Sequence, residues 1–112
     1  MGMWDEEAWD NDSAADWFAD LMDETKLRES WLKAIEDDAE DEYEKIRAAV
    51  WLFVQLGRVY IWPIDDYDKD LELAISKGES VVAMEGLAEE VPDYVSKLKA
   101  EIEELKGRRE KD

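Results

Sequence analysis

Acidic side chains are the groups of this sequence best placed to do chemistry, since the chain has 32 Asp and Glu residues but no His and no Cys. The absence of His and Cys excludes a Ser-His-Asp triad, a cysteine nucleophile, a disulfide scaffold and metal sites built on imidazole or thiolate. What remains is the chemistry of carboxylates, which ligate hard divalent cations or attract basic partners.

Three of these acids, Asp12, Asp16 and Asp20, are spaced four residues apart and would line one face of a helix. Like charges at this spacing repel each other, so a compensating role is expected. Capping explains Asp12, and the positive end of the helix explains Asp16 in part. The other interpretation is a face for a cation or a basic partner. We take the three as candidate partner-binding residues and assign no metal to them.

Pairs of acids three residues apart suggest an enzymatic alternative. Their spacing is similar to that of all-α nucleotide pyrophosphohydrolases, which bind magnesium through such pairs on two helices. Magnesium accepts oxygen ligands alone, and a spacing of three puts both carboxylates on one helix face. A chain this acidic forms such pairs by chance, so the sequence favours a protein without catalytic machinery, metal or cofactor. The candidate pairs are Asp37 with Glu40 or Asp41 with Glu44, combined with Asp65 and Asp68.

Six tryptophans are many for 112 residues. Trp17, Trp31 and Trp51 fall on apolar faces of expected helices, so we expect them in the core, where a large aromatic side chain buries much surface. Trp4 and Trp9 lie outside any helical periodicity. They either cover the core or contact a partner, because Trp is enriched at interface hot spots. Both are candidate partner-binding residues.

No export or membrane segment is expected. Residues 1–24 contain nine acids and neither Lys nor Arg, whereas a signal peptide starts with basic residues and continues as an apolar run. The longest apolar stretch, Ala48 to Leu56, is far shorter than the ~20 residues that cross a bilayer. We therefore expect a cytoplasmic protein without membrane contact.

Helical periodicity extends over most of the chain and predicts an all-α protein, a compact bundle of about five to six helices. No Pro-rich or Gly-rich linker interrupts the sequence, so residues 1–112 are expected to form a single acidic helical domain. Capping residues and helix breakers set the expected bounds. The first predicted helix starts at Ser13 and is capped by Asp12 or Ser13. The other predicted helices cover Lys26 to about Asp38, Tyr43 to Leu56, Asp65 or Asp66 to Gly78, Ser80 to Glu90, and a last segment that starts at Pro92.

Two stretches of this pattern are less regular. The acidic run from Glu36 to Glu44 is expected to be a turn or a solvated helix start. Residues 50–62 could instead form a short hairpin in an α+β fold, because β-branched and aromatic residues flank Gly57. Helix is favoured for residues 50–56, since residues 44–49 are good helix formers. The last helix has an apolar seam at alternating spacings of three and four, formed by Val95, Leu98, Ile102 and Leu105.

The opening of the chain resembles a known family. It reads Met1-Gly2-Met3-Trp4, and residues 9–17 read Trp-Asp-Asn-Asp-Ser-Ala-Ala-Asp-Trp. This resembles the bacterial family catalogued as domain of unknown function 4259, whose members begin Met-Gly-x-Trp-Gly-x-Gly-x-Phe and continue Asn-Asp-x-Ala-x-Asp-Trp. The likeness covers about the first 22 residues, with Asp5 and Glu7 in place of two family glycines. It implies a small, mostly helical bacterial protein and brings no activity, cofactor or partner.

The charge balance gives the functional prediction. With 14 Lys and Arg residues against 32 acids, the formal net charge is −18. Phosphate-backbone binding needs a concentrated basic face, so direct nucleic-acid binding is not expected. Electrostatic steering speeds association with basic partners. We predict a non-catalytic acidic module that binds or regulates a basic protein. The alternatives are the magnesium-dependent phosphohydrolase and an acidic surface that serves solubility alone, without nucleic-acid mimicry.

Overall fold

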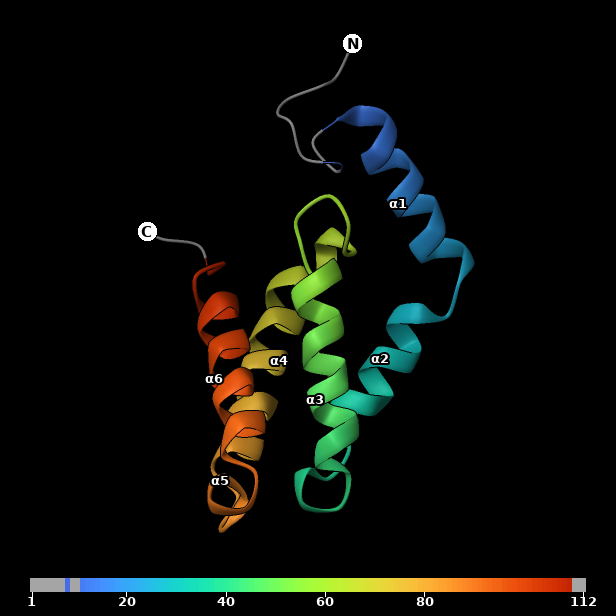
Figure 1. Cartoon of the computed structure of the whole chain (residues 1–112). Coiled ribbons are helices and arrows are strands. Elements are labelled where there is room, and N and C mark those ends of the chain that lie inside the picture. Colours follow the sequence, from blue (N-terminus) through green and yellow to red (C-terminus); the bar gives the residue numbers. More distant parts are fainter. Residues whose placement is uncertain (1–7, 9–10, 110–112) are drawn as a thin grey trace.

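The computed structural model describes residues 8 and 11–109, and every regular element in them is a helix (Figure 1). This confirms the predicted all-α bundle. The hairpin alternative is wrong, because residues 50–56 continue a long helix and residues 57–63 form a loop without strand pairing. The elements are α1 (Asp12–Glu24), α2 (Leu27–Ile35), α3 (Ala39–Leu56), the 3-10 turn η1 (Ile64–Asp66), α4 (Tyr67–Val82), α5 (Leu87–Glu90) and α6 (Pro92–Lys106).

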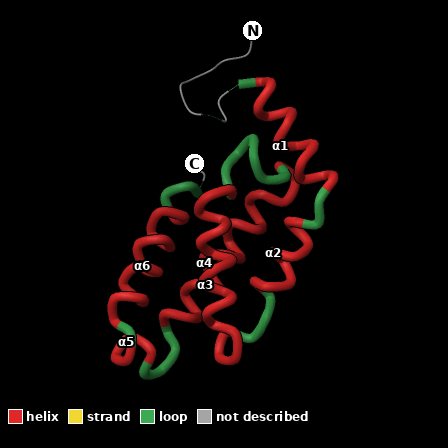
Figure 2. The backbone as a smooth tube through the Cα atoms, turned by 45° about the vertical axis from the view of Figure 1, so that its right-hand side comes forward, coloured by secondary structure: helices red, strands yellow, loops and turns green. Residues whose placement is uncertain are grey.

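Three long helices form the body of the molecule. α3, α4 and α6 pack on one another in alternating directions, α2 covers α3 and α4, and the short α5 packs on α6 (Figures 1 and 2). α1 differs from the others, because it extends beyond the end of this bundle and buries only Met22. Among the described residues, no helix is both long and apolar enough to span a bilayer.

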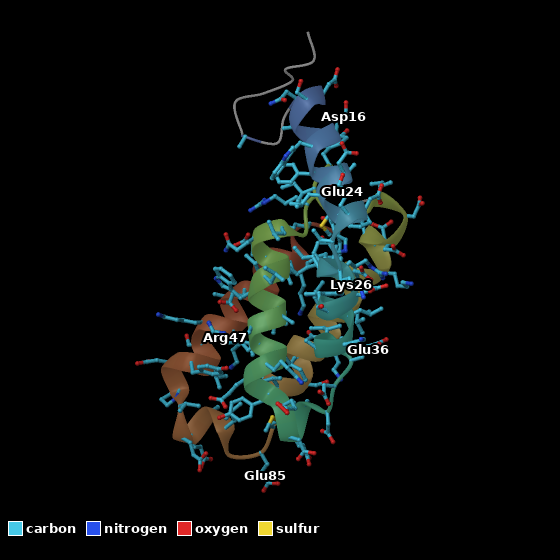
Figure 3. All side chains as sticks on the ribbon, turned by 90° about the vertical axis from the view of Figure 1, so that its right-hand side faces the viewer. Asp16, Glu24, Lys26, Glu36, Arg47 and Glu85 are labelled. Atoms are coloured by element: carbon cyan, nitrogen blue, oxygen red, sulfur yellow. The ribbon has the colours of Figure 1, made fainter. Side chains whose placement is uncertain are left out.

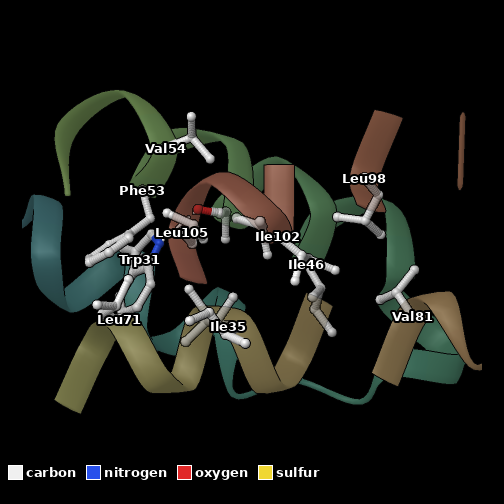
Figure 4. Close-up of a cluster of buried hydrophobic side chains, with 14 of the residues drawn as sticks. Trp31, Ile35, Ile46, Phe53, Val54, Leu71, Val81, Leu98, Ile102 and Leu105 are labelled. Atoms are coloured by element: carbon white, nitrogen blue, oxygen red, sulfur yellow. Dashed lines mark hydrogen bonds between the residues drawn. The ribbon is translucent and has the colours of Figure 1, made fainter. Parts of the chain in front are cut away.

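The core lies where α2, α3, α4 and α6 meet (Figure 4). The apolar seam predicted for the last helix is confirmed, since all four of its residues are buried. Trp31 is buried as expected, and its indole Nε1–H donates to the Ala49 carbonyl over 2.8 Å. Its ring meets Phe53 and Trp62 with centroids 5.3 and 5.1 Å away. This aromatic cluster joins α2, α3 and the loop that follows α3.

Gly78 does not end the fourth helix as predicted. It lies inside α4 and is buried, and a Cβ at this position would come within 3.0 Å of the Ile102 side chain. Close packing of α4 on α6 therefore outweighs the poor intrinsic helix propensity of glycine. Because α4 continues past Gly78, the predicted helix from Ser80 to Glu90 is also wrong. Its first residues belong to α4, and α5 is a single turn that starts after Gly86, whose φ is +83°.

Two helix starts also differ from expectation. The cap of α1 is Asn11, neither Asp12 nor Ser13, because the Asn11 side chain accepts the Ala14 backbone N–H over 2.8 Å. The predicted start at Tyr43 is four residues late, because α3 begins at Ala39, capped by Asp38, with a kink at Glu42. The acidic run is thus a helix start, which is one of its two expected forms. Early acids suit this position because they face the positive end of the helix.

A buried carboxylate links three segments of the fold. The Asp70 side chain of α4 is fully buried and accepts from Arg28 Nε and Nη2 of α2 over 2.7 and 2.9 Å. It also accepts the indole N–H of Trp62 over 2.7 Å. Three charge-assisted hydrogen bonds therefore satisfy a group that would be costly to bury alone.

Arg108 fastens the end of α6 to the end of α3. Its guanidinium donates to the backbone carbonyls of Phe53, Val54 and Gly57 over 3.3, 2.7 and 3.0 Å. Helix carbonyls at this end have no partner within the helix, so the cation both caps them and meets the negative end of the dipole. Burial is the main cause that lowers the pKa of Arg108, and the nearby Arg58 lowers it further.

Replacing Asp70 with alanine is expected to destabilise the fold by about 3 kcal/mol or more, because Arg28 and the Trp62 indole lose their acceptor inside the protein. Asp70→Asn keeps an acceptor and should cost less. Glu72→Ala, which removes an exposed pair with Arg109 two residues along α4, should cost under about 1 kcal/mol. Urea unfolding of the three variants measures these differences. Similar losses for Asp70→Ala and Glu72→Ala would contradict the central role of Asp70.

Burial raises the pKa of the Tyr67 hydroxyl. The folded state therefore resists ionisation more than the unfolded chain, whose tyrosine pKa is about 10. The resulting stabilisation is complete below the unfolded pKa and is lost as pH rises through the folded pKa. Urea unfolding at about pH 8 and about pH 11 should show a larger loss for the wild type than for Tyr67→Phe. Equal losses would show that Tyr67 ionises as freely in the folded chain.

Candidate functional site

A groove of ≈ 550 Å³ separates α1 from the loop between α3 and η1. Because α1 extends beyond the end of the bundle, its inner side faces this loop and buries only Met22. One wall comes from α1 and the other from the loop and η1. The lining residues are Ala15, Asp16, Ala19, Met22 and Asp23 on α1, and Tyr60, Ile61, Trp62, Pro63, Ile64, Asp65 and Asp66 opposite.

The groove has an apolar floor and an acidic rim. Met22, Ile61 and Trp62 are buried and form the floor. Trp62 is held there by its bond to Asp70, so the network described above positions the floor. On the rim, Asp16 and Asp23 of α1 are exposed. Such a site offers apolar contact at its centre and negative charge at its edge, which is the anatomy of a protein-docking surface.

Exposed apolar side chains lie in the groove and on the segments that form its walls. Ile64 and Tyr60 line it with 66% and 52% of their surface exposed, and Val59 and Trp17 lie on the same segments with 39% and 59% exposed. Tyr60 also has a φ of +78°, a left-handed backbone that costs a residue with a side chain about 1–2 kcal/mol. Clusters of exposed apolar residues are a feature of interaction sites.

The charges of α1 differ from those of the bundle. α1 has five acids and no Lys or Arg, and no ion pair within residues 11–109 includes any of the five. In the described part of the bundle, seven bases instead pair with bundle acids, as in the bidentate contact of Arg47 with Glu101 over 2.8 and 3.3 Å. Bundle acids such as Glu29 and Asp68 also lie outside these ion pairs, but α1 has five such acids within 13 residues. The helix that borders the groove therefore has a high density of uncompensated negative charge.

The sequence-predicted site residues are only partly brought together. Asp12, Asp16 and Asp20 are all exposed on α1, but only Asp16 lines the groove. Figure 3 labels Asp16 on α1. Trp4 and Trp9 lie outside the described residues. Sequence reasoning missed Tyr60 and Ile64. The available signal was the apolar run of residues 59–62, which is too short for a core helix and is followed by Pro63 and then by Ile64.

Two of the tryptophans predicted for the core are not there. Trp17 and Trp51 are 59% and 50% exposed. Trp17 lies on α1, where the bundle offers no partner surface, and contacts Phe18 edge-on over 5.2 Å. Trp51 lies on the outer side of α3 beside Arg47, which packs over the Tyr94 ring at 4.6 Å. Trp51, Arg47 and Tyr94 line a second depression of ≈ 400 Å³. This depression is less suited to a charged partner than the groove beside α1, because Arg47 is already neutralised by Glu101.

The acidic pairs considered for magnesium lie far apart. Asp37 precedes α3 and binds Lys45 over 2.7 Å, and this hydrogen bond holds the pKa of the Asp37 carboxyl below its usual value. Asp65 lies in η1, which follows the other end of α3, and the 18 residues of that helix span about 27 Å (Figure 1). In the part of the chain that the structure describes, no three acids are grouped closely enough to hold a metal ion.

Divalent cations are accordingly expected to act only as screening charge. At matched ionic strength, magnesium, manganese and calcium should raise the unfolding temperature by equal, small amounts relative to chelator, because each screens a net charge of −18. A specific ion at a hundred times its dissociation constant would instead add ~2.7 kcal/mol. Tryptophan fluorescence during thermal unfolding measures the shifts. A large shift with one ion alone would support the phosphohydrolase alternative.

The acidic groove beside α1 is thus the site with the most distinctive chemistry in the described chain. Comparison with models of protein families, with curated proteins and with solved structures found no match for this chain. The resemblance of its opening residues to domain of unknown function 4259 therefore stays a prediction. The function must be inferred from the geometry and charge of the groove itself.

Proposed function

We propose that this protein is a non-catalytic acidic module that binds a basic protein partner at the groove between α1 and the α3–η1 loop. The observation that carries the proposal is the coincidence of apolar and acidic groups at one place. Ile64 and Tyr60 expose apolar surface there, and Asp16 and Asp23 border it with negative charge. Apolar contact supplies affinity, and the surrounding charge supplies rate and selectivity.

The distribution of ion pairs supports a basic partner over an acidic surface that serves solubility alone. Solubility needs only net charge, spread anywhere on the surface. Here the five acids of α1 remain outside the ion pairs of the described residues, on the helix that forms one wall of the groove. Their mutual repulsion at short helical spacing costs stability that a basic partner would recover. Trp4 and Trp9, which precede α1 in the sequence, stay candidate contacts of the same partner.

The proposal is tested by isolating partners and then measuring the purified pair. Proteins retained by the immobilised wild-type chain would be purified singly and titrated by calorimetry against wild type, Ile64→Ser and Val91→Ser. Ile64 and Val91 are both exposed apolar residues, but only Ile64 lines the groove. Ile64→Ser should weaken binding about tenfold or more, as expected for a hot spot, and Val91→Ser should leave it unchanged.

Three further results bear on the proposal. The partner should be basic, and its affinity should fall steeply with salt, since screening weakens attraction to the acidic rim. Alanine at both Trp4 and Trp9 should weaken binding as well. A partner that binds wild type and Ile64→Ser equally would show that the groove is not the binding site.

A further inference from the structure

We propose that the occupant of the groove is a short amphipathic basic helix of the partner, lying along α1 with its apolar stripe on the groove floor. This inference rests on the proposed function and names the form of its ligand. It follows from the backbone chemistry of the groove walls, the spacing of the acids on α1, and the charge of the alternative occupants.

The groove walls favour a helical occupant over an extended one. An extended segment in an apolar groove must find partners for its own backbone N–H and C=O groups, usually at the edge of a sheet. The described residues form no sheet, and the α1 wall presents side chains on a helix whose backbone groups are already paired. A helix satisfies its own backbone and needs only an apolar stripe to match.

The α1 wall has small side chains where a second helix would pack against it. Ala15 and Ala19 are four residues apart, and their small side chains let a second helix approach to the usual interaxial distance of about 8–10 Å. Asp16 and Asp23 border them seven residues apart, which is two turns or about 10.5 Å along the axis. The matching ligand therefore has Lys or Arg two turns apart beside an apolar stripe.

Charge argues against two other occupants. A second copy of this chain would bring another −18 and would place acids against acids, because α1 has five of them and no base. The chain's own residues 1–10 contain four acids and neither Lys nor Arg, so they too match the acidic rim poorly. A basic helix alone combines apolar contact with opposite charge.

The probe is a synthetic peptide of about 18 residues, with Leu at spacings of three and four and Lys flanking the stripe two turns apart. Two controls have the same composition. One has a scrambled order that destroys the stripe. In the other, a Pro that the probe has at its N-terminal end is exchanged with a central residue outside the stripe, so that the helix is broken while the Leu spacing is kept. Fluorescence anisotropy gives the affinity, and far-ultraviolet circular dichroism reports helix formation on binding. The intact peptide should bind about tenfold or more tightly than either control and gain helix as it binds.

Two charge variants locate the peptide without changing the overall charge between them. Asp16→Lys with Asp23→Lys reverses the groove acids, whereas Asp20→Lys with Glu24→Lys makes the same change on α1 outside the groove lining. All four side chains are exposed, so neither pair should disturb the core. The groove pair should weaken peptide binding about tenfold or more, and the outer pair less than about threefold. If both pairs weakened peptide binding equally, the attraction would depend only on the overall charge of α1, and the inference would be overturned.

Other results would assign the groove differently. Equal affinity for the broken-helix peptide would indicate an extended ligand. Sedimentation of the free chain as a dimer that the groove variants dissociate would assign it to a second copy. Tighter peptide binding by a chain with alanine at Trp4 and Trp9 would assign it to the chain's own N-terminal residues. If the purified partner depends on Ile64 but no helical peptide binds, the helix inference fails while the proposed function stands.

Discussion

The carboxylate of Asp70 is the constraint on which the bundle and its groove both depend. It is fully buried on α4 and bonded to Arg28 on α2 and to the indole of Trp62. One group thus sets the position of α2 against α4 and fixes the Trp62 ring as the groove floor. The ring in turn packs on Trp31 and Phe53, with centroids 5.1 and 4.8 Å away. A disturbance at Asp70 would therefore reach the core and the groove together.

The acidity of the protein is organised by segment. In the bundle, bases hold helices together at defined places, as where Arg108 joins α6 to the end of α3 and Arg109 pairs with Glu72 of α4. The bidentate bond from Arg109 holds the pKa of the Glu72 carboxyl below its usual value. α1 has no base of its own, and its acids make no such bonds in the described chain. Stability and the proposed recognition thus use different carboxylates of one very acidic sequence.

Sequence periodicity predicted the helices well because helix formation and burial of an apolar stripe are local properties. The seam of α6 and the burial of Trp31 followed from spacing alone. Tertiary packing determines which apolar faces are covered and where some helices end, and periodicity does not predict either. Periodicity gave α1 an apolar face but could not show that the bundle leaves it uncovered, so Trp17 was placed in the core. Gly78 is typical of a helix end by its local propensity. Its actual role depends on the close packing of Ile102 from α6, which local propensity does not reveal.

The groove was less predictable than the helices, since its two walls are far apart in the sequence and its loop wall has no periodicity. Asp16 was identified from its spacing, but Ile64 and Tyr60 were not. Asp70 did leave a signal, because it shares a helix face with Tyr67, Leu71 and Ala74, which are buried. A charged residue on an apolar face calls for a buried partner.

The projection of α1 also has a hydrodynamic consequence. The Cα radius of gyration is 15.3 Å and the longest dimension is 52 Å, against 27 and 25 Å for the other two. A compact chain of this length would have a radius of gyration of about 13 Å. A ligand seated beside α1 would add mass to the narrow end of this elongated particle without lengthening it. The scattering profile and the tumbling of the complex would therefore be more isotropic than those of the free chain, although the complex has the larger mass.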